Sequence, residues 1–146
     1  METYNLHHTT KGYLDRVRSH IVPYTTMVKG LELVIFPEVM SPKYDIVPHF
    51  HVDNLEDLTG KKVLDMGCGC GVIGVHAIKN GASSVISVDI NPKAIENTKK
   101  NYELLGYDGV TIQSDMFNSL KNYKEYFDLI CFNAPYHGIK PKNDLE

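Results

Sequence analysis

The sequence predicts an α/β protein with a Rossmann-like parallel sheet, and two observations predict this fold. After Gly60, short runs rich in β-branched residues alternate with stretches that have helical periodicity. A glycine-rich stretch, residues 67–74, lies between the first of these runs and the helix that follows it. Because strands that alternate with helices imply right-handed crossovers, we expect a mostly parallel sheet with helices on both faces.

The elements of this regular part follow from their composition and end signals. The predicted strands span residues 61–66, 84–89, 110–113 and 127–132. The predicted helices span residues 72–80, 92–105 and 118–125. Gly81 ends the first helix, Asn91 caps the second, and Gly106 ends it.

The first 59 residues are irregular by comparison. Prolines recur through them, so we expect short, loop-rich segments, with one helix over residues 13–21 and one strand over 31–36. The chain therefore divides into an N-terminal segment, 1–59, and a regular part, 60–146, that carries the glycine-rich stretch.

Size and composition exclude several classes of protein. The 146 residues suffice for one domain, and 42% hydrophobic with 23% charged residues is a globular balance. No apolar run approaches the roughly 20 residues that span a bilayer, and no secretory signal is visible. Three cysteines inside apolar segments are typical of a reducing compartment, so a cytoplasmic location without membrane contact is expected. The net charge of −3 argues against a surface that binds nucleic acid throughout.

The glycine-rich stretch begins at Asp65 and allows two interpretations. Gly69 to Gly74 satisfies G-x-G-x-x-G, and Asp89 follows at a distance that suits a nicotinamide dinucleotide site. The alternative unit, D-x-G-x-G-x-G, starts at Asp65. A carboxylate there would repel a pyrophosphate but suits the ammonium group of a nucleoside that carries an amino acid, so charge favours the second interpretation.

Two further strand ends carry acidic side chains followed by apolar ones. Asp89 can accept hydrogen bonds from both ribose hydroxyls, and Ile90 can cover a purine face; a simple helix-approach cap is the alternative. Asp115 can accept from an adenine amino group, with Met116 or Phe117 against the ring; a solvated loop aspartate is the alternative.

The fourth strand ends in Asn133-Ala134-Pro135-Tyr136. Open α/β sheets bind ligands at the carboxyl ends of their strands, where this motif falls. The side-chain oxygen of Asn133 and a neighbouring carbonyl can accept from one planar N–H donor, on which Tyr136 can stack. The motif therefore suits a nitrogen whose lone pair is directed at an electrophile.

A metal site is not expected. Cys68-x-Cys70 lacks a second pair of ligands, so packing is the favoured role of both thiols. The histidines at 7, 8, 49 and 51 are interpreted as surface residues.

These motifs, in this order, resemble the class I S-adenosylmethionine-dependent methyltransferases over about residues 31–138. Within that class the chain is similar to N-methyltransferases with N-P-P-Y after strand four, such as release-factor glutamine and small-domain ribosomal RNA guanine methyltransferases. The segment 33–42 resembles the one that closes over the cofactor in these families. The resemblance implies a cofactor site formed by Asp65, Gly67, Cys68, Gly69, Gly71, Asp89, Ile90, Asp115, Met116 and Asn133. It implies that Asn133, Pro135 and Tyr136 are catalytic.

The resemblance also implies methyl transfer to an amide or amine nitrogen of a protein, an RNA or a small molecule. Ala134 replaces a proline of the family motif, which leaves the backbone less rigid. The chain supplies the half of the seven-stranded family fold ordered 3-2-1-4, so we interpret it as truncated or split. The edge of strand four is then expected to bind a partner chain or a second copy. The alternative function is a cofactor-binding fragment, or one half of a split enzyme, without activity of its own.

Overall fold

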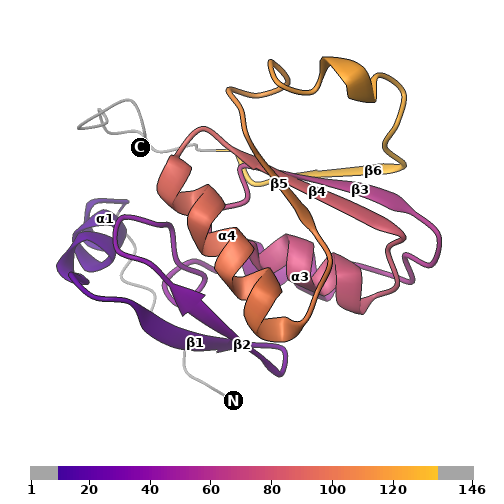
Figure 1. Ribbon diagram of the computed structural model, residues 1–146. Coiled ribbons are helices and arrows are strands. Elements are labelled where there is room, and N and C mark those ends of the chain that lie inside the picture. The colour runs from indigo at the N-terminus through magenta and orange to yellow at the C-terminus, as the bar shows by residue number, and fades with distance from the viewer. Residues whose placement is uncertain (1–9, 135–146) are drawn as a thin grey trace.

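The computed structural model of the protein describes residues 10–134. Its main sheet contains the four predicted strands, β3 (Lys62–Met66), β4 (Ser84–Asp89), β5 (Val110–Gln113) and β6 (Leu129–Phe132). All are parallel, in the order β5-β4-β3-β6. The α/β fold and the 3-2-1-4 order are therefore confirmed, and the carboxyl ends of all four strands lie at one edge of the sheet (Figure 1).

Two predicted helices follow β3 and β4, namely α3 (Val72–Lys79) and α4 (Pro92–Leu105). The side chain of Asn91 accepts a hydrogen bond from the backbone N–H of Lys93 at 3.0 Å, which caps α4 as predicted. Gly106 ends α4 in the left-handed conformation. Both helices pack on the same face of the sheet (Figure 1).

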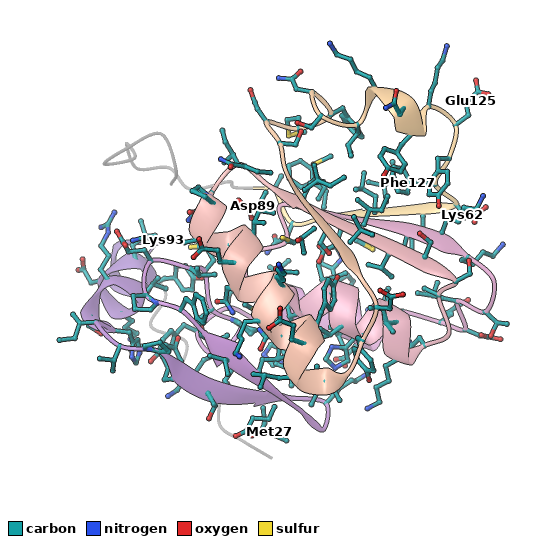
Figure 2. All side chains as sticks on the ribbon, in the orientation of Figure 1. Met27, Lys62, Asp89, Lys93, Glu125 and Phe127 are labelled. Atoms are coloured by element: carbon teal, nitrogen blue, oxygen red, sulfur yellow. The ribbon has the colours of Figure 1, made fainter. Side chains whose placement is uncertain are left out.

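The expectation of helices on both faces is wrong for the described residues. The helix predicted over 118–125 is only a 3-10 turn, η1 (Lys121–Tyr123). Ser114 accepts a hydrogen bond from the N–H of Ser119 and donates one to the carbonyl of Met116, and these bonds hold the turn that precedes η1. This segment still covers the second face of the sheet, with Leu120 buried and Phe127 above the strands (Figure 2).

The N-terminal segment is more regular than predicted. It contains α1 (Thr10–Ser19), a hairpin of β1 (Tyr24–Val28) and β2 (Leu31–Ile35), and α2 (Val47–Asp53). The sequence analysis missed β1, whose antiparallel pairing with β2 turns through Lys29 and Gly30, both at positive φ. It also missed α2, because Pro48 was taken as a helix breaker although proline is tolerated in a first helical turn.

Two buried asparagines of α4 attach the hairpin to the main sheet domain. Asn97 accepts from the N–H of Phe36 and donates to the carbonyl of Val34, at 2.8 and 2.7 Å. Asn101 accepts from the N–H of Val34 at 2.8 Å and donates to the carbonyls of Val34 and Cys70. One helix face thereby holds β2 and the glycine-rich stretch together.

The main hydrophobic core lies between α3, α4, the hairpin and the sheet, and includes Leu33, Ile35, Val63, Val75 and Val85. Among residues 10–134, no helix has both the length and the apolar character that a membrane span requires.

Candidate functional site

A cavity of about 330 Å³ opens at the carboxyl ends of the strands. One wall consists of the strand ends and the glycine-rich stretch, and the other comes from the N-terminal segment. Of the residues predicted to bind a cofactor, eight line it: Gly67, Cys68, Gly69, Asp89, Ile90, Asp115, Met116 and Asn133. The structure thus brings together side chains that are spread over 67 positions of the sequence, from Gly67 to Asn133.

The glycine-rich stretch turns sharply because Gly67, Gly69 and Gly71 are all left-handed, with φ of 68°, 55° and 82°. A Cβ at Gly67 would lie 3.5 Å from the ring of Phe132, and one at Gly69 would lie 3.7 Å from the carbonyl oxygen of Met40. Phe132 and Met40 both line the cavity, so the loop lies beside both walls there, and its positive φ values are what favour glycine. Gly71 does not line the cavity; a Cβ there would collide with Thr98 of α4, so its role is packing of the loop on the helix.

Asp89 is held in a defined orientation at the end of β4. Its Oδ2 accepts from the N–H of Gly69 and its Oδ1 from the N–H of Asn91, each at 2.9 Å. The carboxylate therefore ties the glycine-rich stretch to the start of α4, and it also lines the cavity (Figure 2). Burial raises the pKa of Asp89, which the backbone donors oppose.

Asp65 is placed differently from the role predicted for it. Its side chain is fully buried beneath the glycine-rich stretch, accepts from the N–H of Gly74 at 3.0 Å, and does not line the cavity. Burial, with a smaller effect from the charge of Asp89, raises its pKa to about 7, and the hydrogen bond from Gly74 opposes this rise. Among the described residues Oδ1 has no hydrogen-bond partner. Asp65 thus supports the start of α3 from inside instead of facing a ligand.

The ends of β5 and β6 complete the first wall. Asp115 and Met116 are exposed and follow β5, where Met116 takes a positive φ of 47°. Asn133 and Ala134 follow β6 and line the same cavity. Pro135 and Tyr136, predicted to be catalytic, lie outside the described residues.

The second wall was largely missed by sequence reasoning. It contains Tyr13 of α1 and five residues of the stretch before and inside α2: Met40, Ser41, Pro42, Asp45 and Pro48. Residues 33–42 had been expected to close over the site, but nothing in the pattern singled out Tyr13 or Asp45. The hydroxyl of Tyr13 accepts from the N–H of Ser41 at 3.2 Å and contacts the sulfur of Met40 at 3.6 Å, so α1 positions this wall.

The cysteines fit packing roles. All three are buried, and burial raises the pKa of Cys70 to about 12 and that of Cys131 to about 11, which keeps their thiols protonated. Cys68 accepts a hydrogen bond from the hydroxyl of Thr98 at 3.2 Å. Within residues 10–134, no group of three or more His, Cys, Asp or Glu side chains is placed to hold a metal ion.

Comparison with known proteins defines the class to which this site belongs. The sequence profile of the methyltransferase small domain family matches residues 31–145, so the chain belongs to that family. This assignment replaces the nicotinamide interpretation of the glycine-rich stretch. Residues 135–145 contribute to the match by sequence alone.

Two individual proteins illustrate the relationship. A protein of Methanocaldococcus jannaschii, provisionally named a protein N5-glutamine methyltransferase, is 37% identical over 109 residues, 75% of this chain and 53% of that protein. The ribosomal protein L11 methyltransferase of Vibrio cholerae is 54% identical over 50 residues, 34% of this chain and 17% of that enzyme. The chain therefore spans about half the length, or less, of these relatives.

Among solved structures, a 16S rRNA N2 G1207 methyltransferase of T. thermophilus, in complex with AdoMet and guanosine, superposes with a TM-score of 0.69 at 25% identity. The match covers 80% of this chain and 33% of that one. A Pyrococcus abyssi tRNA (uracil-54, C5)-methyltransferase, in complex with S-adenosyl-L-homocysteine, shares the fold, with a TM-score of 0.55 at 24% identity over 64% of this chain and 24% of that one. S-adenosylmethionine is the methyl donor of this class.

The residues around the cavity fit this cofactor. The volume falls within the range of about 300–1,000 Å³ that is usual for small-molecule sites. Its lining combines a glycine-rich loop, an oriented carboxylate at Asp89, and apolar side chains at Ile90 and Met116. The charged side chains that line it among the described residues are all aspartates, which suits a ligand that carries positive charge.

Proposed function

We propose that the protein is an S-adenosylmethionine-dependent N-methyltransferase that acts on an amide or amine nitrogen. The observation that carries this proposal is that Asn133 lies in the same cavity as the glycine-rich stretch and Asp89. An acceptor held by Asn133 would therefore share one enclosed space with the methyl donor.

Residues at different positions in the cavity would bind different parts of the cofactor. Gly67 and Gly69 would leave room for the amino-acid end of the cofactor, and Asp89 would accept from its ribose hydroxyls. Ile90 and Met116 would cover the adenine, and Asp115 would accept a hydrogen bond from the adenine amino group. These assignments follow the order of the strand ends across the sheet.

The acceptor side depends on Asn133. Its side-chain oxygen, with the carbonyl of Ala134, would accept from the N–H groups of the acceptor, orient the nitrogen and stabilise the positive charge that develops on it. When bound, the sulfonium supplies an activated methyl group: as the acceptor nitrogen forms the N–C bond, the C–S bond breaks, its electron pair stays on sulfur, and the nitrogen then loses a proton to water. Pro135 and Tyr136 remain predicted contributors to this end of the site.

A protein glutamine side chain is the first acceptor to test. Support comes from the relative named for that reaction, which aligns with three quarters of this chain, and from the absence of any Lys, Arg or His among the described residues that line the cavity. A polynucleotide acceptor would need cations for its phosphates. Guanosine, RNA and small amines are the comparison substrates.

The experiment measures formation of S-adenosylhomocysteine with each acceptor for the wild type and for Asn133→Ala. Removal of this acceptor group should lower turnover by about 10²- to 10³-fold, the usual effect of losing one such electrostatic contact. Affinity for S-adenosylhomocysteine, measured by calorimetry, should change by less than about twofold. Asn118→Ala, at an exposed position after β5, is the control and should alter neither quantity. Equal loss of turnover and affinity would contradict the assignment of Asn133.

A second candidate is a cofactor-binding half that needs a partner chain for catalysis. It is favoured by β6, which pairs on one side only within the described residues. S-adenosylhomocysteine binding without turnover on any acceptor would favour this candidate over the first.

A further inference from the structure

We propose that Asp45, and not Asp65, holds the ammonium group of S-adenosylmethionine. This inference rests on the proposed function and deepens it, because it assigns the residue that recognises the amino-acid end of the cofactor. It starts from the position of Asp65, whose fully buried carboxylate lies beneath the glycine-rich stretch and outside the cavity.

Among the described residues, three carboxylates line the cavity and could bind the ammonium group. Asp89 and Asp115 follow β4 and β5, and the proposed function assigns them to the ribose and the adenine. Asp45 is the third, and it lines the opposite wall. An ammonium group taken into an enclosed site needs a charged or strongly accepting partner, since its desolvation is otherwise costly.

The wall that carries Asp45 lies against the glycine-rich stretch. The carbonyl oxygen of Met40 is 3.7 Å from the position of a Cβ on Gly69, a van der Waals distance, so the wall lies directly beside the loop. Lys93 of α4 forms an ion pair with Glu38, which fixes the beginning of the wall beside the end of β4 that carries Asp89 (Figure 2). Tyr13 holds Met40 and Ser41 from the other side.

The local structure holds the carboxylate of Asp45 in place. Its Oδ1 accepts from the N–H of Val47 at 3.0 Å, and among the described residues this is the one hydrogen bond to its carboxylate. The side chain is half-buried, and it lies close enough to Tyr13 that its negative charge adds to the effect of burial, which raises the pKa of that phenol. The carboxylate, which lines the cavity, thus has capacity for a further donor.

The competing explanation is that Asp45 only shapes the turn that leads into α2. Asp57 offers a matched control for this role, because it accepts from the N–H of Thr59, two residues on, in the same kind of turn at 2.9 Å. Asp57 is exposed and does not line the cavity. Asparagine can preserve both turns, since its side-chain oxygen accepts the same hydrogen bond.

The experiment is calorimetry on the wild type, Asp45→Asn and Asp57→Asn with two ligands. S-adenosylhomocysteine carries the ammonium group, whereas 5′-methylthioadenosine has the same nucleoside and sulfur without the amino acid. Asp45→Asn should weaken binding of S-adenosylhomocysteine by about 10- to 100-fold, the loss expected for a hydrogen bond to a charged group, and leave 5′-methylthioadenosine unchanged. The Asp57→Asn variant should bind both ligands with the affinity of the wild type.

Several outcomes overturn the proposal. Unchanged affinity of Asp45→Asn for S-adenosylhomocysteine would exclude a contact with the ammonium group. Equal loss of both ligands would show that Asp45 supports the wall and does not recognise the amino acid. If the wild type bound neither ligand, the proposed function itself would fail, which is a different result from either of these.

Discussion

At the scale of single residues, Asp65 shows how an acidic side chain can serve a cofactor site without touching the cofactor. Strand side chains alternate, so Asp65 points to the same face of β3 as Val63, toward α3. There it accepts from the N–H of Gly74, and a Cβ on Gly74 would lie 2.2 Å from the hydroxyl of Tyr102 and 2.9 Å from that of Ser87. Asp65 therefore belongs to a buried polar group under the glycine-rich stretch.

This burial predicts a dependence of stability on pH. The pKa of Asp65 is raised from 3.8 to about 7, so the folded state binds a proton that the unfolded state releases above pH 4. Its contribution to the free energy of unfolding is full below pH 3.8 and is lost as pH rises to about 7, by up to about 4 kcal/mol at 1.36 kcal/mol per pKa unit.

Urea unfolding between pH 4 and 8 measures this contribution. Asp65→Asn should remove that part of the pH slope, whereas Asp108→Asn, at an exposed side chain, should leave the slope as in the wild type. A wild-type stability that rises steadily over this range, with no difference in slope for Asp65→Asn, would show that Asp65 is ionised in the folded protein.

At the scale of elements, the buried face of α4 contains polar as well as apolar side chains. Of the periodic residues Ala94, Ile95, Thr98, Tyr102 and Leu105, three (Ala94, Thr98 and Tyr102) are buried and two are partly buried, but Asn97 and Asn101 on that face are buried as well. Their amides satisfy backbone groups of β2 that the two-stranded hairpin leaves unpaired on that edge. Hydrogen bonding to an exposed strand edge is thus the reason for polar residues in this core.

Asn101→Ala should detach β2 from α4. It leaves the N–H of Val34 and the carbonyl of Cys70 without this partner, so the free energy of unfolding should fall by about 1–3 kcal/mol, as measured in urea. Hydrogen exchange at the Val34 amide should accelerate. Lys100→Ala, on the exposed side of the same helix, should do neither, and an Asn101→Ala protein with unchanged exchange at Val34 would contradict the role assigned to this side chain.

The strength of the local sequence signal explains which elements were predicted and which were missed. Strands β3 to β6 and helices α3 and α4 have strong local signals, including the Asn91 cap and the glycine ends. Strand β1 was missed although Tyr24–Val28 has an alternating burial pattern, because its pairing depends on positive φ at Lys29 as well as Gly30. Helix η1 is shorter than the predicted helix because Lys124, with a ψ of 130°, and Glu125, with a φ of 55°, leave the helical conformation.

At the scale of the whole molecule, the main sheet has one apolar edge. Strand β6 pairs with β3 only, and within residues 10–134 its other edge has no partner strand. Ile130 on this strand is 49% exposed, and Phe132, which is 37% exposed, lines the cavity. An unpaired edge with exposed apolar side chains is a surface for pairing with another chain, and we propose that this chain associates through β6.

A charge at this edge should suppress association. The wild type should elute in gel filtration with light scattering at a mass that rises with concentration, and Ile130→Lys should shift it to the monomer mass. Ile21→Lys, at the 85% exposed position between α1 and β1, should leave the association as in the wild type. A wild-type protein that stays monomeric at all concentrations would contradict the proposal.

The sequence by itself determined the strands, the glycine-rich stretch and the positions of Asp89, Asp115 and Asn133, because each lies at the end of a strand with a clear local signal. The strand order was implied by the family resemblance. The carboxyl ends of parallel strands meet at one edge, so naming the strands was enough to bring these residues together. Only the tertiary structure decided that Asp65 turns under the loop and that Asp45 lines the cavity. Their placement depends on packing between segments distant in sequence, α1 with residues 40–45 and the hairpin with α4, which no local pattern records.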